Sequence, residues 1–411
     1  MNVRADRFYL VDSLRGVAAL MVLAVHVSWL SGASDIGTWT APWFSRLESA
    51  FAMFFAISGF LLYRPFVRAR LMSQPPLSTR AYGWRRFLRI VPAFWVALTV
   101  IAIWLGNDVW NPYELVRNFG FLQLYYGAGT NDVIPQAWTL SVEVSFYLLL
   151  PIWAAFMRRL PARDFEGRMR GELIAVWAVV AASLAYTAVV VYSHAVDPIP
   201  YSPKPLLAAL PAYMDHIGVG MLLAVISVRV LDRGDGELPQ PLRTLARYPS
   251  LAWGIAAAAF AVGALWLGLR PAYTPTEYVG RHLINDVIAA SVLIPAVFGD
   301  PRRGLTRRIL ASRPILYVGL ISYGFYLFHW AVIQQLFRWK LEGRIGFLTS
   351  YPVWFVTALV GALVLGSLSY YLVERPALSL KRLVPPRPSA RRDEAIAEAA
   401  PATPVVAPPT G

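Results

Sequence analysis

The stretch "LRGVAALMVLAVH" places two ionisable side chains, Arg15 and His26, in an otherwise apolar segment. They are eleven residues apart, so on a helix they face the same way within about 20° and lie roughly 16 Å apart along the axis. An imidazole titrates near neutral pH and is the commonest general base of enzymes. The spacing predicts a helix face with a guanidinium near one membrane boundary and an imidazole deep in the bundle. The alternative is an arginine that extends to the inner boundary and a histidine bonded to a neighbouring helix.

Two further apolar segments carry ionisable side chains at a similar expected depth. "QAWTLSVEVSFYLLLP" contains Glu143, and "ISYGFYLFHW" contains His329. A carboxylate beside an imidazole fixes its tautomer and raises its basicity, which suits general-base catalysis. We therefore predict that Glu143 orients His26. For Glu143 the alternative is a structural bond between helices, and for His329 aromatic packing is as compatible with the pattern as catalysis.

A basic cluster and small residues mark the expected cytoplasmic ends of two other segments. In "RAYGWRRFLRIVP", Arg86 and Arg89 share a helix face and Arg85 is adjacent. Guanidinium pairs bind phosphate through charge-assisted hydrogen bonds, although cytoplasmic loops are rich in arginine in any case. In "FFAISGFLL", Ser58 and Gly59 permit either close helix packing or close approach of a ligand.

Other polar side chains in apolar segments leave two roles open. Those of the expected sixth and eighth spans could line a polar cavity for a sugar-like acceptor or could bond between helices. They are Asp215, His216, Asn285 and Asp286. His194 and His282 lie near expected outer boundaries, where we expect contact with water. Glu374 and Arg375 close the last span, and we expect a structural ion pair between them.

Ten apolar runs must position these side chains, and each is long enough to cross a hydrocarbon core of roughly 30 Å. The sequence is 57% hydrophobic and only 15% charged, whereas soluble chains have about 25% charged residues. The fold class is therefore predicted to be an all-α, polytopic transmembrane helical bundle. The spans are expected near residues 10–30, 47–64, 87–106, 137–157, 172–193, 206–228, 250–269, 283–299, 315–337 and 352–373.

The net charge of +14 does not indicate nucleic acid binding, because the basic residues gather in alternate loops. This asymmetry follows the positive-inside rule and predicts that both termini are cytoplasmic. The chain has no cysteine, which excludes disulfides and thiolate chemistry. We predict a transmembrane domain over residues 1–376 and a disordered, basic, Pro/Ala-rich cytoplasmic tail over residues 377–411.

Six fragments, in order, resemble the acyltransferase-3 family of bacterial integral-membrane enzymes, which includes O-antigen and peptidoglycan O-acetylases. They are "DSLRGVAALMVLAVH", "FFAISGFLL", "RRFLRIVPAFW", "AWTLSVEVSFYLLLP", "ISYGFYLFHW" and "YYLVERP", and the resemblance covers about residues 7–376. It implies transfer of an acyl group, usually acetyl, from cytoplasmic acyl-CoA to a hydroxyl of a glycan or glycolipid. The family's first-helix motif matches Arg15 and His26, and the resemblance implies that both are essential to catalysis. Its Arg-x-x-Arg motif matches Arg86 and Arg89, which the resemblance assigns to the acyl donor, and its Trp-containing acidic motif matches Trp138 and Glu143.

Together these observations predict a membrane-bound O-acyltransferase of the bacterial plasma membrane. His26 acts either as general base on the acceptor hydroxyl or as a transient acyl carrier. The acyl-CoA site is predicted from Arg85, Arg86, Arg89 and Ser58. The acceptor pocket is predicted from Trp138, Ser141, His329, Tyr326, Asp286 and Asp215. Candidate donors to the thioester oxyanion are Ser141, Tyr323 and Tyr326.

The expected partners are acyl-CoA as co-substrate, the glycan or glycolipid acceptor and the lipid bilayer, with no nucleic acid. We expect no permanently bound cofactor and no metal. A different class of function stays open, namely a secondary transporter or lipid-linked sugar flippase. In that case the charges of His26 and Glu143 would line a permeation path and relay protons.

Overall fold

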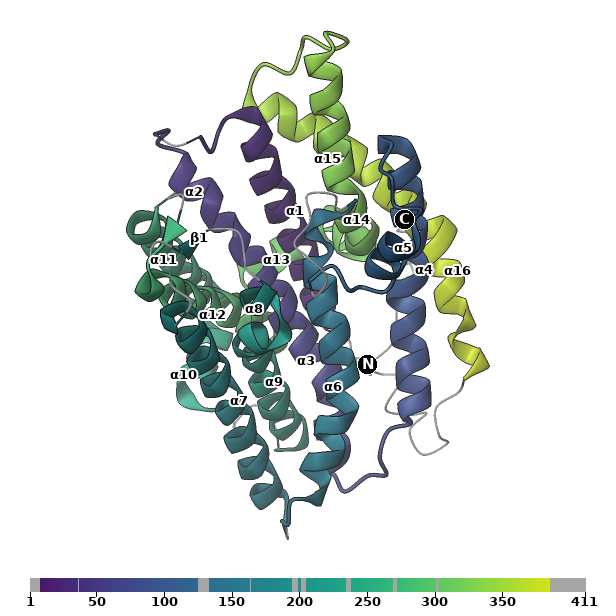
Figure 1. Cartoon of the computed structure of the whole chain (residues 1–411). Coiled ribbons are helices and arrows are strands. Elements are labelled where there is room, and N and C mark those ends of the chain that lie inside the picture. Colours follow the sequence, from purple (N-terminus) through teal and green to yellow (C-terminus); the bar gives the residue numbers. More distant parts are fainter. Residues whose placement is uncertain are drawn as a thin grey trace, which may run out of the picture.

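The computed structural model describes residues 8–35, 37–124, 133–162, 164–193, 199–200, 205–233, 238–268, 272–300 and 303–384. In these ranges, ten helices are long and apolar enough to cross a membrane, which confirms the predicted all-α bundle (Figure 1). The strands of this part of the chain, β1 (Ile199–Pro200) and β2 (Ala272–Tyr273), form one short antiparallel pair. Most of the predicted tail, residues 385–411, lies outside the described residues. The cytoplasmic placement of the termini stays a prediction.

The long helices form the body of the bundle, and shorter ones connect them. The long helices are α1 (Tyr9–Ser31), α3 (Ala50–Leu71), α4 (Thr79–Leu105), α6 (Trp138–Arg159), α7 (Phe165–Ser193), α9 (Leu210–Arg233), α11 (Pro249–Leu267), α12 (Pro275–Val297), α14 (Arg313–Leu341) and α15 (Tyr351–Ser369). The short ones are α2 (Ala41–Arg46), α5 (Pro112–Phe119), α8 (Pro205–Ala208), α10 (Gln240–Arg247), α13 (Leu305–Leu310) and α16 (Arg375–Ser379). Single turns of other helix types are η1 (Leu47–Ser49), η2 (Pro135–Ala137), η4 (Tyr370–Glu374) and η5 (Leu380–Leu383).

Two helices begin about two turns earlier than hydropathy predicts, because capping residues define their starts. The Ser78 hydroxyl accepts a hydrogen bond from the backbone N–H of Ala81, so α4 begins at Thr79 instead of residue 87. Thr274 and Glu277 form a capping box, so α12 begins at Pro275 instead of residue 283. The first turns of both helices are polar, and an apolar window therefore misses them.

Helix α3 lies in the middle of the bundle and packs most extensively on α9 (Figure 1). The two helices approach at glycines: a Cβ atom at Gly59 would collide with the carbonyl oxygen of Ile217, and one at Gly220 with that of Ala56. The close-packing alternative for Gly59 is therefore confirmed. This contact fixes α9, and with it the buried charges that α9 carries.

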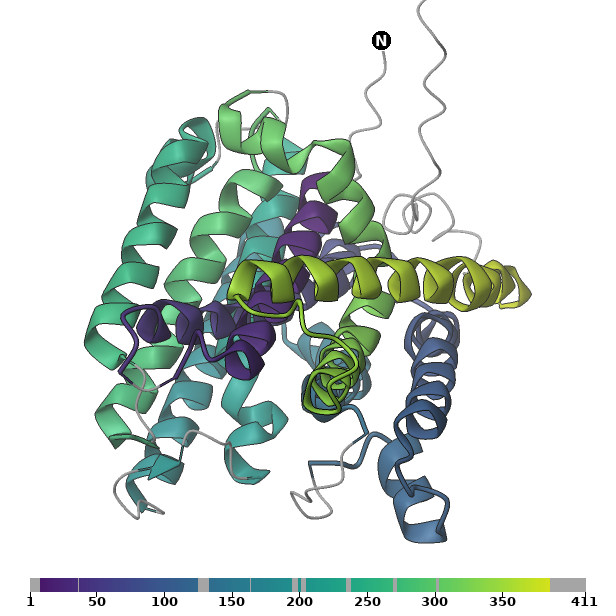
Figure 2. The same ribbon diagram turned by 90° about the horizontal axis from the view of Figure 1, so that it is seen from above.

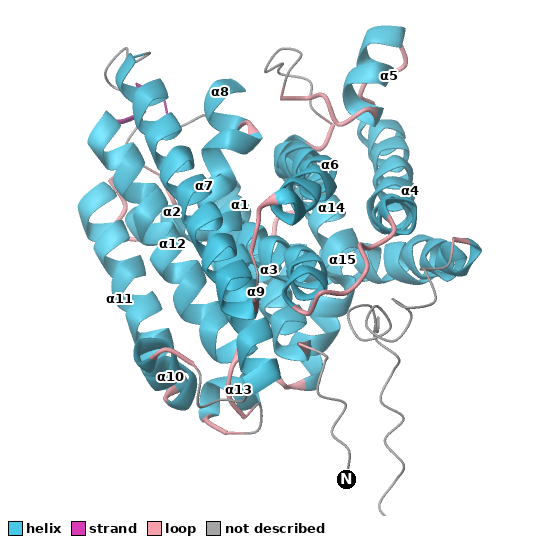
Figure 3. Ribbon diagram, turned by 90° about the horizontal axis from the view of Figure 1, so that it is seen from below, coloured by secondary structure: helices cyan, strands magenta, loops and turns pink. Residues whose placement is uncertain are grey.

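Helix α1 packs against α14 and α3, so its polar face is enclosed by the bundle. Helix α15 packs on both α1 and α14, and Figure 2 shows it crossing over α1. Helix α4 lies at one edge, where it contacts α14 and η4 and has α5 beside it (Figure 3). The residues of α1, α6 and α14 that the sequence singles out are thus brought into one neighbourhood, whereas the arginines of α4 lie at its border.

Candidate active site

A cavity of about 400 Å³ opens between α1, α3, α6, α9, α12 and α14. Arg15, His26 and Glu143 all line it, so the three side chains predicted to be catalytic face one space. Mostly apolar walls with a few convergent polar groups are typical of small-molecule sites. The aromatic part of the wall consists of Trp29, Phe51, Phe54, Phe55, Trp138, Tyr213, Tyr323, Tyr326 and Trp330.

His26 is held by a hydrogen-bonded chain that starts at the backbone of α14. Nδ1 of His329 lies 2.7 Å from the carbonyl oxygen of Tyr326, and Nε2 of His329 lies 2.8 Å from Nδ1 of His26. A carbonyl oxygen only accepts, so Nδ1 of His329 donates to it. In a neutral ring Nε2 of His329 is then the acceptor, and Nδ1 of His26 donates to it. This assignment leaves Nε2 of His26 with a lone pair, and no group in the described part of the chain bonds to it.

Glu143 does not orient His26 as predicted. Its Oε1 accepts a hydrogen bond from the Ser58 hydroxyl at 2.6 Å, and its Oε2 accepts one from the Tyr147 hydroxyl at 2.9 Å. Ser58 therefore holds this carboxylate, which is a different role from the predicted contact with the acyl donor. The partner of His26 is His329, which the sequence pattern left undecided between packing and catalysis.

Arg15 lines the cavity and interacts with charges on other helices. Its charge is close enough to those of Arg89 and Glu143 for all three to interact electrostatically. Its Nε is buried and has no hydrogen-bond partner among the described residues. Since about 16 Å of helix separate Arg15 from His26, the guanidinium cannot reach atoms that react at the imidazole.

The arginines predicted to bind acyl-CoA do not line the cavity. The Arg86 guanidinium lies over the Tyr82 ring, 5.8 Å from its centroid. Nη1 of Arg89 lies 4.0 Å from Oε2 of Glu374, so Glu374 pairs with Arg89 and not, as predicted, with Arg375. Arg85, which directly precedes Arg86 on α4, is buried. The cavity is thus lined by Arg15 but by none of the three α4 arginines, of which Arg89 interacts electrostatically with Arg15.

Two residues of the predicted acceptor pocket, Trp138 and Tyr326, line the cavity, but Ser141 and His329 do not. The Ser141 hydroxyl is buried and donates to Oε1 of Gln123 at 3.3 Å. His329 lies behind His26 as its hydrogen-bond partner. Only two of the six residues predicted for the pocket therefore line the cavity, and its aromatic wall extends further than the motifs indicate.

The hydroxyls predicted as oxyanion donors are already engaged. The Tyr326 hydroxyl donates to the carbonyl oxygen of Gln136 at 2.6 Å, and the Tyr323 hydroxyl donates to that of Ile90 at 2.9 Å. With Ser141 bonded as well, each of the three would have to give up a hydrogen bond before it could stabilise an oxyanion.

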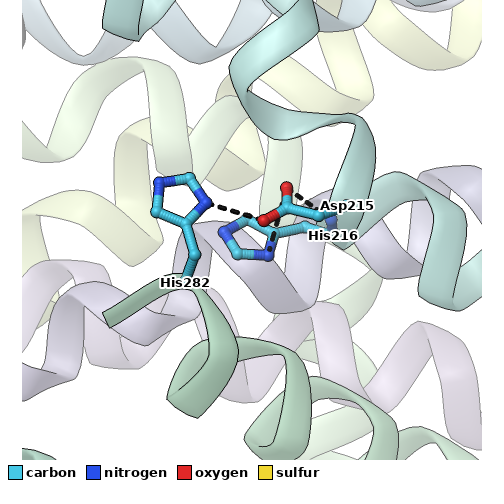
Figure 4. A group of neighbouring side chains, drawn as sticks. All are labelled: Asp215, His216 and His282. Carbon is cyan, nitrogen blue, oxygen red and sulfur yellow. Dashed lines mark hydrogen bonds and ion pairs between the residues drawn. The ribbon is translucent and has the colours of Figure 1, made fainter. Parts of the chain in front are cut away.

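Asp215 and Asp286 do not line the cavity but form a network between α9 and α12 with His216 and His282. Figure 4 shows three of these side chains, Asp215, His216 and His282. Nδ1 of His216 lies 2.6 Å from Asp286, and Nδ1 of His282 lies 2.7 Å from Asp215. Bonding between helices is therefore the role observed. The predicted contact of His282 with water is wrong, because α12 starts early enough to bury this residue two turns inside. His194 lies outside the described residues.

The same network contains side chains that could hold a metal ion. The ligand atoms of Asp215, His216 and His282 all lie within 4.8 Å of one another. Around tetrahedral zinc, bonds of 2.0–2.1 Å separate neighbouring ligand atoms by about 3.3 Å. Within this group, Nδ1 of His282 lies only 2.7 Å from Oδ2 of Asp215, which is the distance of a direct charge-assisted hydrogen bond. Nδ1 of His216 lies 3.7 Å from Oδ1 of Asp215 and is bonded at 2.6 Å to Asp286, which is outside the group. This geometry favours a structural role that joins two helices.

Comparison with known proteins adds independent information. A family model described as an acyltransferase domain matches residues 8–372. The chain is 26% identical over 398 residues to nodulation protein 10 of Rhizobium leguminosarum bv. viciae, covering 90% of this chain and 93% of that protein. It is 26% identical over 424 residues to acyltransferase MdmB of Streptomyces mycarofaciens, covering 96% and 98%.

A longer relative is peptidoglycan O-acetyltransferase OatA of Listeria monocytogenes, which is 23% identical over 402 residues. That match covers 91% of this chain but only 57% of the Listeria protein. No solved structure matches the chain at a significant level.

Proposed function

The chain belongs to the acyltransferase family whose model spans residues 8–372, and we propose that it transfers an acyl group, usually acetyl, from cytoplasmic acyl-CoA to a hydroxyl of a cell-envelope glycan or glycolipid. Ten apolar helices and bacterial relatives make it a multi-pass bacterial membrane protein. The observation that carries the proposal is the chain from the Tyr326 carbonyl through His329 to His26. It supplies an imidazole nitrogen with a lone pair on the wall of a cavity.

In the proposed reaction, Nε2 of His26 removes the proton of the acceptor hydroxyl while the hydroxyl oxygen attacks the thioester carbonyl carbon. The tetrahedral intermediate collapses, the carbon–sulfur bond breaks, and the sulfur of CoA leaves with the proton that His26 has taken up. The products are the acyl ester and free CoA. If His26 carries the acyl group, its Nε2 attacks the thioester carbon first and CoA leaves as the thiolate. The acceptor hydroxyl then attacks the acyl-imidazole, the bond to Nε2 breaks, and the hydroxyl proton passes through His26 to the thiolate.

His329 acts as a positioning residue in this scheme. Because its Nδ1 is committed to the Tyr326 carbonyl, its Nε2 accepts the Nδ1–H of His26 and fixes that tautomer. When His26 becomes positively charged, this hydrogen bond becomes charge-assisted and therefore stronger. His329 thus orients His26 and fixes its tautomer, as a carboxylate does in many hydrolases, but His329 is a neutral acceptor.

We assign the acyl donor, acyl-CoA, to the part of the site that contains Arg15 and the arginines of α4. Arg86, Arg89 and the adjacent Arg85 offer guanidinium groups that suit the phosphates of CoA. Arg15, which interacts electrostatically with Arg89, continues this positive charge to the cavity wall. The linear pantetheine arm would then run past Arg15 toward His26. Glu143, fixed by Ser58 and Tyr147, supplies the negative charge that balances Arg15.

The test is release of free CoA from labelled acetyl-CoA by the full chain in lipid nanodiscs, with extracted envelope glycans and glycolipids as acceptors. The proposal requires CoA release that depends on acceptor and transfer of label to it, whereas a transporter or flippase would release none. Chemical analysis of the labelled fraction then identifies the acceptor and the ester. Absence of CoA release with every acceptor fraction would refute the enzymatic function.

A further inference from the structure

A second pair of charged side chains lines the same cavity and has no part in the mechanism above. Glu48 of η1 and Arg281 of α12 both face it. Oε2 of Glu48 lies 3.5 Å from Nη1 of Arg281, and the two side chains are only 11% and 6% exposed. Charges buried at membrane depth are costly unless they are paired, and they commonly mark substrate sites. This pair therefore needs an explanation.

Neighbouring groups hold both members of the pair in place. Nη1 of Arg46 lies 3.0 Å from Oε1 of Glu48, and Arg46 also donates to the Tyr273 hydroxyl. Burial raises the pKa of Tyr273, so this phenol stays neutral. The Arg281 guanidinium lies over the Tyr278 ring, 4.5 Å from its centroid. Both charges are thus fixed from behind, which is how a binding site is preorganised.

Three aromatic side chains form the wall beside the pair. The ring of Trp138 lies 5.9 Å from that of Phe51 and 5.3 Å from that of Tyr213, and all three line the cavity. The Tyr213 ring in turn lies 5.8 Å from that of His282, which follows Arg281 and is anchored to Asp215. The buried network described above therefore supports this wall of the cavity from outside.

Together these groups have the chemistry that recognises a sugar ring. A carboxylate accepts hydrogen bonds from hydroxyls, a guanidinium donates them, and neighbouring hydroxyls of a sugar present both functions at once. Flat aromatic rings bury the C–H faces of the same sugar. A single alcohol on an alkyl chain has one hydroxyl only and would make fewer hydrogen bonds with the two groups.

We propose that Glu48 and Arg281 select the acceptor by binding two neighbouring hydroxyls of a sugar ring, so that a further hydroxyl is presented to His26. The three aromatic rings, Phe51, Trp138 and Tyr213, pack against that sugar. This inference rests on the proposed function, since it assigns the acceptor half of the same cavity. It makes the Glu48–Arg281 pair the determinant of acceptor class.

Because the chain has no cysteine, the Thr139→Cys variant places a single thiol on the cavity wall. Its reaction with a maleimide would be measured in nanodiscs with octyl β-glucoside or 1-octanol below micellar concentration. At about twice its Kd, a bound probe slows labelling about threefold. We expect such protection by octyl β-glucoside and none by 1-octanol at the same concentration. Adding Glu48→Gln or Arg281→Gln should abolish the protection.

The matched control is Glu172→Gln, which breaks a buried ion pair with Arg70 that does not line the cavity. Glu172→Gln should keep the glucoside protection. Where Arg281→Gln does not give monodisperse protein, Arg281→Lys, which keeps the charge, replaces it as the test variant. Equal protection by glucoside and octanol, or protection that survives both substitutions at Glu48 and Arg281, would overturn the inference. Such a result with intact CoA release leaves the proposed function standing, whereas protection without CoA release refutes that function instead.

Discussion

His26 and His329 meet between α1 and α14, and His216 and His282 meet between α9 and α12, with ring centroids 5.0 and 4.9 Å apart. The first pair ends on a backbone carbonyl and leaves one nitrogen of His26 unbonded on a cavity wall. In the second pair each ring is bonded to a carboxylate, and neither ring lines the cavity.

The comparison shows that residue type and membrane depth do not decide between chemistry and structure. A histidine bonded to a carboxylate is the arrangement usually associated with a general base, yet here it joins two helices. The pair without a carboxylate has the free nitrogen and the open space that a reaction needs. Access to the cavity, and not the acid–imidazole contact, is therefore the criterion that separates the two pairs.

The largest expected effect is at His26. The His26→Ala variant should lower the rate of CoA release by about 100- to 10,000-fold, the contribution of a general base. Release of CoA from labelled acetyl-CoA is the measurement, with folding checked by size-exclusion chromatography. A variant that keeps more than a tenth of the wild-type rate would place the reacting group elsewhere.

The second pair should respond in stability instead. Asp215→Asn removes a charged acceptor from buried His282, so the free energy of unfolding should fall by about 1.5–3 kcal/mol. Equilibrium unfolding in mixed micelles measures this. The rate of CoA release per folded molecule, at saturating acceptor, should stay within about twofold, as for a site that does not touch the reacting atoms. A rate as low as that of His26→Ala would erase the contrast between the pairs.

His329 sharpens the comparison because it links His26 to the backbone. His329→Ala should lower CoA release by about 10- to 100-fold, the usual cost of losing a positioning partner. His329→Gln keeps an acceptor for the Nδ1–H of His26 and should recover part of that loss. The acid limb of the pH profile, where neutral His26 is lost, should move in both variants. A structural role alone would leave that limb where it is in the wild type.

Much of the scaffold was predictable from the sequence because bilayer thickness and helix rise fix the length of a span. The ten spans follow from apolar runs, and the missed first turns of α4 and α12 follow from caps that hydropathy does not register. Which residues face the cavity was predictable in part. The eleven-residue spacing places Arg15 and His26 on one face, and both do line it.

The partners within the site were not predictable, because they depend on which helices are neighbours. The sequence places Glu143 and His329 at similar depth but does not show that α14, and not α6, packs most closely on α1. Glu48 was not predicted either: it lies in a short turn at the very start of the expected span 47–64, and Arg281 lies just before the expected span 283–299. The role proposed for them can be recognised only from the structure, in which both line the same cavity.

The smallest expected effect concerns the predicted acyl-CoA site, where Arg86 and Arg89 either bind the donor or only set the orientation of the chain in the membrane. Arg86→Gln and Arg89→Gln should each raise the KM for acyl-CoA about tenfold, which corresponds to one lost hydrogen bond to a charged group, while kcat changes little. Arg303→Gln is the matched control, because Arg303 is 85% exposed and pairs only with nearby Asp300 among the described residues. If the two α4 variants change protein abundance but not KM, their arginines serve membrane orientation, and the donor must reach Arg15 by another path.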